Sequence, residues 1–140
     1  MGAKFQIIGK EATARVTKSG ELVVASLAYE ETKFVELAED NVGYNFFVPQ
    51  FKKQFVITGF LAVGDQQITG NANANVIIYE AADRDTATVD KILIQFVVKQ
   101  DQDIAMPGIR ILVSAGKFVN AKTDDDDVHM TIMGFYIDKL

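Results

Sequence analysis

Hydrophobic and polar residues alternate along most of the chain with the period of two that is typical of β-strands. The clearest example is the segment 91–99, in which Ile92, Ile94, Phe96 and Val98 share one face. The other face of this segment is mostly polar, which is the pattern of a half-buried strand in an antiparallel sheet.

A second strand alternates in the same way and places Phe55, Ile57, Leu61 and Val63 on one face. Gly59 lies in its middle, and a glycine inside a strand often marks a bulge or the close approach of another backbone. The same pattern predicts further strands at 5–8, 12–17, 75–80, 109–113 and 117–122, and an extended segment at 44–48 before Pro49.

The last predicted strand, 128–137, is apolar on both faces. We therefore expect it near the middle of a sheet, or between a sheet and a partner subunit. The segment 21–30 is ambiguous, because its apolar residues fit a helical stripe as well as a strand alternation. A strand is favoured there, and a helix remains the alternative.

Turn-forming residues separate the predicted strands. They occur at Gly64-Asp65, 70–73, 83–85, Pro107-Gly108, Ala115-Gly116 and 124–127. The turn at Ala115-Gly116 is short enough for a tight hairpin. The rhythm predicts an all-β protein, an antiparallel β-sandwich of jelly-roll type with about eight strands, while Greek-key alternatives such as an immunoglobulin-like topology stay open.

We expect a single domain overall. Residues 1–43 form an N-terminal arm with strands continuous with that domain, and residues 44–140 form the sandwich core. The length suits one domain with a core large enough to fold without disulfides or metals.

Composition excludes several kinds of site. The chain has no Cys and one His, so it has no disulfide, no Cys-ligated zinc and no set of imidazoles for a catalytic metal. Its net charge of −5 gives no electrostatic reason to bind nucleic acid, and no apolar run approaches the length of a membrane span. We predict no cofactor, no nucleic-acid partner and no membrane partner.

Four consecutive carboxylates at Asp124–Asp127 offer oxygen ligands of the kind that Ca²⁺ prefers. A contiguous run lacks the alternating spacing of a calcium loop, so a solvated turn is favoured over a cation site. His129 follows, with Asp127 placed to share its face as in a general-base arrangement. A structural histidine at the start of a strand is the favoured interpretation.

Three further groups admit a chemical and a structural interpretation. Glu80, Asp83, Asp85 and Asp90 contain the carboxylates that glycoside hydrolysis needs, but a solvated loop is favoured. The alternating amides of 70–75 could bind sugar hydroxyls, but a turn leading into an edge strand is favoured.

The third group is aromatic and consists of Phe46, Phe47, Phe51, Phe55 and Phe60. Base-stacking platforms interleave aromatic residues with many basic ones, whereas only Lys52 and Lys53 lie among these. Core and interface packing is therefore favoured. We assign no catalytic, cofactor-binding or metal-ligating residue.

A resemblance extends over residues 44–137. It is carried by Phe-Val-Ile-Thr-Gly-Phe at 55–60, Val-Ile-Ile-Tyr-Glu-Ala at 76–81, Thr-Val-Asp-Lys-Ile-Leu at 88–93, Gly-Lys-Phe-Val-Asn-Ala-Lys-Thr at 116–123 and Met-Gly-Phe-Tyr-Ile at 133–137. With these segments the chain resembles small jelly-roll virion structural proteins of tailed bacteriophages, of the capsid decoration or cement type or associated with fibres. The resemblance implies a β-sandwich, a homotrimer, no enzyme activity and no cofactor.

The first functional hypothesis is therefore a non-enzymatic phage virion protein that stabilises the capsid shell as an oligomer. Its partners would be further copies of itself and the major capsid protein or another virion protein, in particles assembled in the bacterial host cytoplasm. The alternative is a carbohydrate- or receptor-binding module on a phage head or tail fibre. A third hypothesis is an enzyme that uses a carboxylate pair.

Overall fold

The computed structural model describes residues 30–65, 73–125 and 127–139, together with the backbone of three short strands that precede them. These strands are β1 (Lys4–Ile7), β2 (Ala12–Val16) and β3 (Leu22–Val23), and they pair antiparallel in the order β1-β2-β3. The predicted strands at 5–8 and 12–17 are confirmed over 5–7 and 12–16, and residues 8 and 17 lie outside the described part. Within the ambiguous segment 21–30, residues 22–23 are extended, and residues 21 and 24–29 lie outside the described part.

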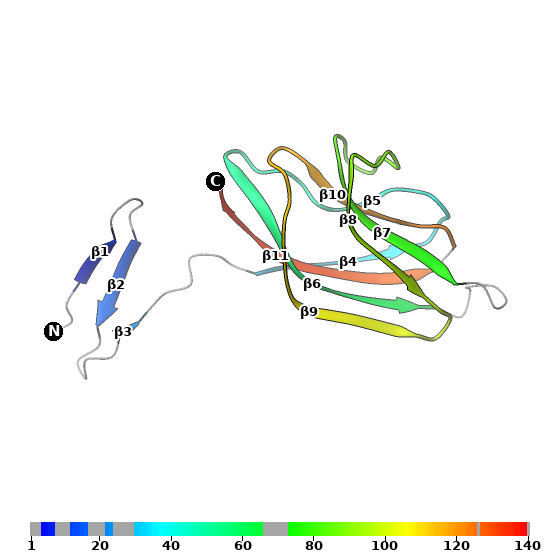
Figure 1. Ribbon diagram of the computed structural model, residues 1–140, viewed down its shortest axis with the longest axis horizontal. Coiled ribbons are helices and arrows are strands. Elements are labelled where there is room, and N and C mark those ends of the chain that lie inside the picture. The colour runs from blue at the N-terminus through cyan, green and yellow to red at the C-terminus, as the bar shows by residue number, and fades with distance from the viewer. Residues whose placement is uncertain are drawn as a thin grey trace.

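Eight further strands form two four-stranded antiparallel sheets. They are β4 (Glu31–Leu37), β5 (Tyr44–Phe47), β6 (Lys53–Gly64), β7 (Ala74–Ala81), β8 (Lys91–Val98), β9 (Asp103–Leu112), β10 (Phe118–Thr123) and β11 (Val128–Asp138). One sheet has the order β4-β11-β6-β9 and the other has the order β5-β10-β7-β8 (Figure 1). The prediction of an all-β antiparallel sandwich is confirmed.

The pairing scheme identifies the topology. The first sandwich strand pairs with the last (β4 with β11), the second with the seventh (β5 with β10), the third with the sixth (β6 with β9) and the fourth with the fifth (β7 with β8). This is the pattern of one long antiparallel hairpin that has been wrapped around a core. The additional pairs β11 with β6 and β10 with β7 complete the two sheets. The arrangement is an eight-stranded jelly roll, as predicted.

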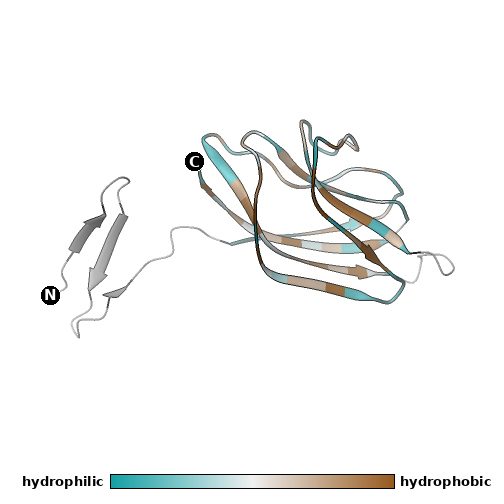
Figure 2. Ribbon diagram, in the orientation of Figure 1, coloured by the Kyte–Doolittle hydropathy of each residue, from teal (hydrophilic) through white to brown (hydrophobic). Residues whose placement is uncertain are grey.

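The core lies between the two sheets and takes residues from every sandwich strand. Its fully buried members include Leu37, Ile57, Phe60, Ile78 and Ile132. Apolar residues accordingly occur along the strands of both sheets (Figure 2). Burial of this apolar surface is the main favourable term in the folding of such a domain.

The sandwich begins at Glu31, before the predicted start of the core at residue 44, because β4 pairs with β11 over seven residues. Strand β11 lies between β4 and β6. Its apolar character on both faces therefore reflects the central position that the sequence predicted.

A bulge at Gly59 is confirmed, and it corrects the predicted face of β6. Between the pairs Met133↔Gly59 and Gly134↔Ile57, β6 advances by two residues while β11 advances by one. The extra residue reverses the alternation, as β-bulges do. Phe60 enters the core, whereas Leu61 and Val63, which the sequence placed beside Ile57, face outward and are each 38% exposed.

A second bulge corrects the predicted face of β8. Ile78 and Tyr79 of β7 pair with Ile94 and Ile92, so Leu93 is the extra residue. Leu93 packs against the core, and Ile92, predicted to be buried, is 49% exposed. The other predicted core residues of this strand, Ile94, Phe96 and Val98, do face the core.

Pro107-Gly108 was predicted as a turn, and the structure places both residues inside β9. Strand β9 is an edge strand beside β6, where a proline is tolerated because its missing N–H faces away from the sheet. Between Pro107 and Ile111, β9 advances by four residues while β6 advances by two, and Gly108 takes a φ of +73°. Pro107 and Gly108 therefore form a bulge inside β9 and not a turn between two strands.

Ala115-Gly116 is a turn but does not close a hairpin. The Lys117 N–H donates to the Ser114 carbonyl, and Gly116 takes a φ of +78°, as expected for a tight turn. The turn nevertheless joins β9 to β10, which belong to different sheets. The predicted hairpin was wrong because the wrapped topology sends the chain across the core at this point.

Candidate interaction surface

The outer side of β10 and β7, in the sheet β5-β10-β7-β8, is covered by the chain itself, whereas Ile92 and Val97 of the edge strand β8 stay exposed. Residues 82–90, which connect β7 to β8, fold back over this face. The Tyr79 hydroxyl donates to the Thr86 carbonyl at 2.5 Å, and the Lys122 Nζ donates to the Ala87 carbonyl at 2.9 Å. Tyr79 is fully buried although it does not belong to the cluster between the sheets. We call this surface the covered face.

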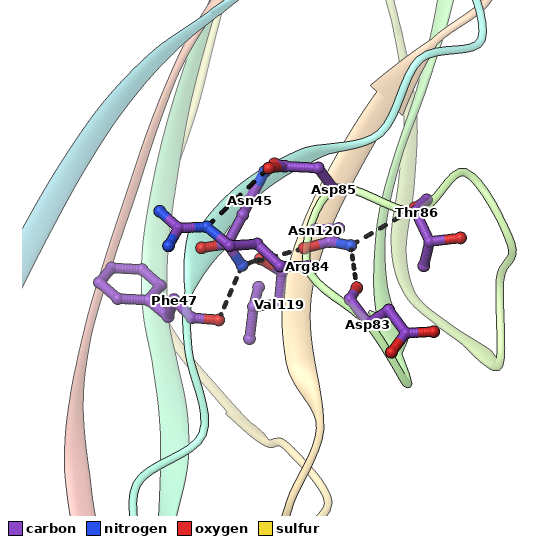
Figure 3. A network of polar contacts seen from close by, with 8 residues as sticks. All are labelled: Asn45, Phe47, Asp83, Arg84, Asp85, Thr86, Val119 and Asn120. Carbon is purple, nitrogen blue, oxygen red and sulfur yellow. Dashed lines mark hydrogen bonds and ion pairs between the residues drawn. The ribbon is translucent and has the colours of Figure 1, made fainter.

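Asn45 and Asn120 connect the loop 82–90 to β5 and β10 by hydrogen bonds (Figure 3). The Asn120 Nδ2 donates to the carbonyls of Asp83 at 3.1 Å and Thr86 at 3.4 Å, and its Oδ1 accepts from the Asn45 Nδ2 at 3.0 Å. The register places Asn45, Asn120 and Tyr79 in one row across β5, β10 and β7. Because Asn120 is fully buried, each of these bonds replaces one that water would otherwise make.

Acidic residues in the stretch 80–90 accept hydrogen bonds from neighbouring parts of the chain. The Glu80 carboxylate is buried and accepts from the Ser114 N–H at 2.7 Å, and the Asp85 carboxylate accepts from the Asn45 N–H at 2.7 Å. The Asp90 carboxylate accepts from the Lys117 Nζ at 2.6 Å, and this hydrogen bond raises the pKa of Lys117. Of the four acidic residues that suggested glycoside hydrolysis, Glu80, Asp85 and Asp90 therefore hold the covering loop and its neighbours in place with their carboxylates, and Asp83 takes part through its backbone carbonyl.

Asp124 and Asp125 follow β10 and Asp127 precedes β11, while Asp126 lies outside the described part of the chain. The Asp124 carboxylate accepts from the Asn75 N–H at 2.7 Å and from the Asn75 Nδ2 at 2.6 Å, which ties the end of β10 to the start of β7. Asp127 is only 8% exposed and takes a φ of +56°, so this member of the run is buried rather than solvated. Among residues 30–65, 73–125 and 127–139, no three acidic or imidazole side chains gather as a metal site.

The contact between Asn75 and Asp124 also tests the prediction that the amides of 70–75 could bind sugar hydroxyls. Residues 70–72 lie outside the described part of the chain. The Asn75 amide, a candidate for binding sugar hydroxyls, instead donates to the Asp124 carboxylate.

The outer face of the other sheet, β4-β11-β6-β9, carries His129. Its Nε2 lies 3.2 Å from the Asp65 carboxylate and 3.8 Å from that of Glu36. The carboxylates beside His129 therefore come from Asp65, directly after β6, and from Glu36 on β4, and not from the candidate Asp127, two residues away in sequence. The Phe34 ring lies beside the imidazole, with 6.0 Å between the ring centroids.

This second outer face exposes a run of large apolar side chains, and we call it the open face. Phe34 on β4 is 59% exposed, and the cross-strand register aligns it with Thr131 and Leu61. Leu112 on β9 is 41% exposed and aligns through Val56 with Phe135, a half-buried residue of β11. Because exposed apolar residues that gather on one sheet can mark a binding surface, the open face is a candidate interaction surface.

A depression of about 490 Å³ lies at one end of the open face. It is lined by Phe34, Val63, Gly64, Asp65, Asp101 and His129. Its volume lies within the range of ligand-sized pockets, roughly 300–1,000 Å³. Its walls combine apolar surface with carboxylates, so they suit a group that is apolar and cationic.

An exposed aromatic residue lies at the opposite end of the sandwich. Phe46, Phe47, Phe55 and Phe60 are buried, as predicted for the phenylalanine group, whereas Phe51 is 88% exposed. The Lys52 Nζ lies 5.3 Å from the centroid of the Phe51 ring. A second depression, of about 500 Å³, surrounds this residue and includes Lys52, Lys53 and Lys139.

Comparisons with known proteins assign no family. No family model and no curated protein matches the chain. One solved structure, described as "Bacillus endospore appendages form a novel family of disulfide-linked pili", is similar with a TM-score of 0.47 and 10% sequence identity, over 81% of this chain and 89% of that chain. A similarity of this degree assigns neither a function nor an assembly to the present protein. Within the described residues, no helix has the length and hydropathy that a membrane span requires.

Proposed function

We propose that this protein is a non-enzymatic structural component of a phage virion. In this role it decorates the capsid, binds the major capsid protein or another virion protein, and stabilises the shell as an oligomer, with a homotrimer as the expected form. Its place would be the virion, assembled in the cytoplasm of the bacterial host.

The open face is the observation that supports this proposal. Phe34, Leu61, Val63 and Leu112 remain exposed on one sheet of the jelly roll, while a loop covers β7 and β10 of the opposite sheet. A protein that binds only the assembled shell stabilises that shell by mass action. Many weak contacts from many copies then add through avidity.

Co-sedimentation with phage particles tests the proposal. Particles stripped of their decoration protein would be mixed with the purified protein, pelleted, and assayed for resistance to heat and to low salt. We expect the wild-type protein to pellet and to raise this resistance. We expect Leu112→Glu, which places a charge on the open face, to do neither.

The matched control is Val97→Glu, which changes an exposed apolar residue on β8, an edge strand of the other sheet. Both variants should show the melting temperature of the wild type, since both positions are exposed. The proposal fails if the wild-type protein stays in the supernatant, or if folded Leu112→Glu protein protects the particles as well as the wild type does. Selective binding to a glycan array would instead support the carbohydrate-binding alternative.

A further inference from the structure

The two ends of the sandwich differ in charge. Strand β6 runs from one end to the other, from Lys53 to Gly64, which corresponds to about 35 Å at roughly 3.3 Å per residue (Figure 1). The end near Gly64 carries the acidic residues Asp65, Asp101, Asp124 and Asp125 in its loops. The end near Lys53 carries four lysines and two carboxylates: Asp138 pairs with Lys53 and Asp90 with Lys117, so the excess positive charge rests on Lys52 and Lys139.

The basic end presents Phe51 and Lys52 on a fixed turn, which we call the tip. The Lys53 N–H donates to the Gln50 carbonyl at 3.1 Å, and the Lys139 N–H donates to the Lys52 carbonyl at 3.0 Å. Lys52 takes a φ of +57°, a conformation that a residue other than glycine seldom adopts. The backbone thus holds an aromatic ring and an ammonium group in solvent, where the ring gains nothing from burial.

The depression at the acidic end has complementary chemistry. Phe34 and Val63 supply apolar walls, and Asp65 and Asp101 supply negative charge. Asp101 is itself fixed, because its N–H donates to the Gly64 carbonyl at 2.9 Å. An aromatic ring with an adjacent ammonium group would meet apolar surface and carboxylates together.

We propose that the tip of one copy of this chain occupies the depression of a second copy. Phe51 would pack against Phe34 and Val63, and Lys52 would pair with the carboxylates of Asp65 and Asp101. The inference rests on the proposed function, because it names the contact by which that oligomer would form. A buried aromatic anchor beside a charged pair is the typical composition of an interface hot spot.

This contact is heterologous, because the tip and the depression are different surfaces at opposite ends of the molecule. Heterologous contacts close into rings where the rotation between copies permits and otherwise extend into open chains. A three-membered ring would be the homotrimer of the proposed function. In a ring, every copy uses both its tip and its depression. In an open chain, every copy except the two at the ends does so.

Two complementary variants test the proposal. Phe51→Ala combined with Lys52→Glu removes the tip, and Val63→Arg fills the depression with a bulky cation that repels Lys52. Both sites are solvent-accessible in the single chain, so both variants should fold, as a thermal melt would verify. Self-association would be measured by sedimentation or light scattering over a series of protein concentrations.

We expect the wild-type protein to associate, and each variant alone to associate at least tenfold more weakly. An equimolar mixture of the two variants should form 1:1 dimers and nothing larger, because it retains one intact tip and one intact depression that can meet. Higher salt should weaken the wild-type contact, since Lys52 and its partners are exposed to solvent. Val97→Ser, at the exposed edge of β8, should associate as the wild type does.

A wild-type protein that stays monomeric at all concentrations would overturn the proposal. So would variants that associate as the wild type does, or a mixture that forms no dimer. The particle assay separates this failure from that of the proposed function. A protein that protects particles without self-associating would keep the virion role and lose the tip contact.

Discussion

The two outer faces of this sandwich differ in how far their side chains are buried. On the covered face, the loop 82–90 lies over Tyr79 and Asn120, which are fully buried, and the Asn120 side chain hydrogen-bonds to Asn45, Asp83 and Thr86. On the open face, Phe34, Leu61 and Leu112 remain between 38% and 59% exposed. Both faces belong to four-stranded sheets of one jelly roll, so the difference comes from the connections and not from the fold.

The difference shows which face is available to a partner. A loop that is held through Thr86, Ala87 and Asp90 already occupies the outer side of β7 and β10, so on this sheet only the edge strand β8 presents exposed apolar residues. The open face has no such cover among the described residues, and its exposed apolar side chains gain free energy only when another molecule buries them. Stability should therefore depend on the covered face, and association on the open face.

The largest expected effect is on the covered face, at Gly43. A Cβ at this position would collide with the Thr86 carbonyl oxygen and lie within 2.7 Å of the Tyr79 hydroxyl. Gly43→Ala should therefore displace the loop and lower the free energy of unfolding by about 3 kcal/mol, measured by urea denaturation. The adjacent Val42→Ala, at a position that is 37% exposed, should change it by less than about 1 kcal/mol. Equal effects at both positions would mean that the loop does not pack on Gly43.

The next effect is at Asn120. Asn120→Ala removes the donor to the Asp83 and Thr86 carbonyls and one of the three acceptors of the Asn45 amide, and it leaves a space in place of a fully buried side chain. We expect the free energy of unfolding to fall by about 2 kcal/mol. Asn73→Ala, at an exposed asparagine before β7, is the matched control and should lie within about 0.5 kcal/mol of the wild type. An Asn120→Ala protein as stable as this control would show that the network contributes nothing.

Much of the fold follows from local sequence, because the alternation in residues 44–137 specifies strands directly. The face that a strand presents is less predictable. One extra residue at Thr58 or Leu93 reverses the alternation, and the bulge becomes visible only once the partner strand is known. This is why Leu61 and Val63 were expected on the same face as Ile57 but belong to the open face.

The contacts between distant residues are harder still to predict. The sequence suggested Asp127 as the partner of His129, but the nearest carboxylate comes from Asp65, 64 positions away. No local pattern marks that pair, since it forms only when β11 aligns with β6. In the loop 82–90, Asp83, Asp85 and Asp90 are exposed as the prediction of a solvated loop requires, but the contacts of Asp85 with Asn45 and of Asp90 with Lys117 could not be predicted from local sequence.

A smaller effect is expected at Tyr79. Tyr79→Phe removes the hydroxyl that donates to the Thr86 carbonyl and should cost about 1 kcal/mol at neutral pH. Burial raises the pKa of Tyr79 to about 12, with the Asp85 carboxylate raising it further and Asn120 opposing the shift. The pKa in the unfolded chain is about 10, so the unfolded state loses its proton first and stability falls as pH rises from about 10 to about 12.

Tyr136 provides a comparison for the loss of stability at alkaline pH. Burial also raises the pKa of Tyr136 to about 12, and its hydroxyl donates to the Val48 carbonyl, away from the covered face. Urea denaturation between neutral pH and pH 12 should show a shallower decline for Tyr79→Phe and, separately, for Tyr136→Phe than for the wild type. A decline unchanged in Tyr79→Phe would mean that its phenol is not shielded by the loop.

The smallest expected effect is on the open face, at Leu112. Its side chain is 41% exposed, so Leu112→Ser removes little buried surface and should change the free energy of unfolding by no more than about 0.5 kcal/mol. The same variant should lose affinity for phage particles, since the apolar contact would be gone. Val97→Ser, with a comparable exposed fraction of 43%, should keep both properties. A loss of several kcal/mol in Leu112→Ser would show that this face, too, is buried in solution, and the contrast between the two faces would disappear.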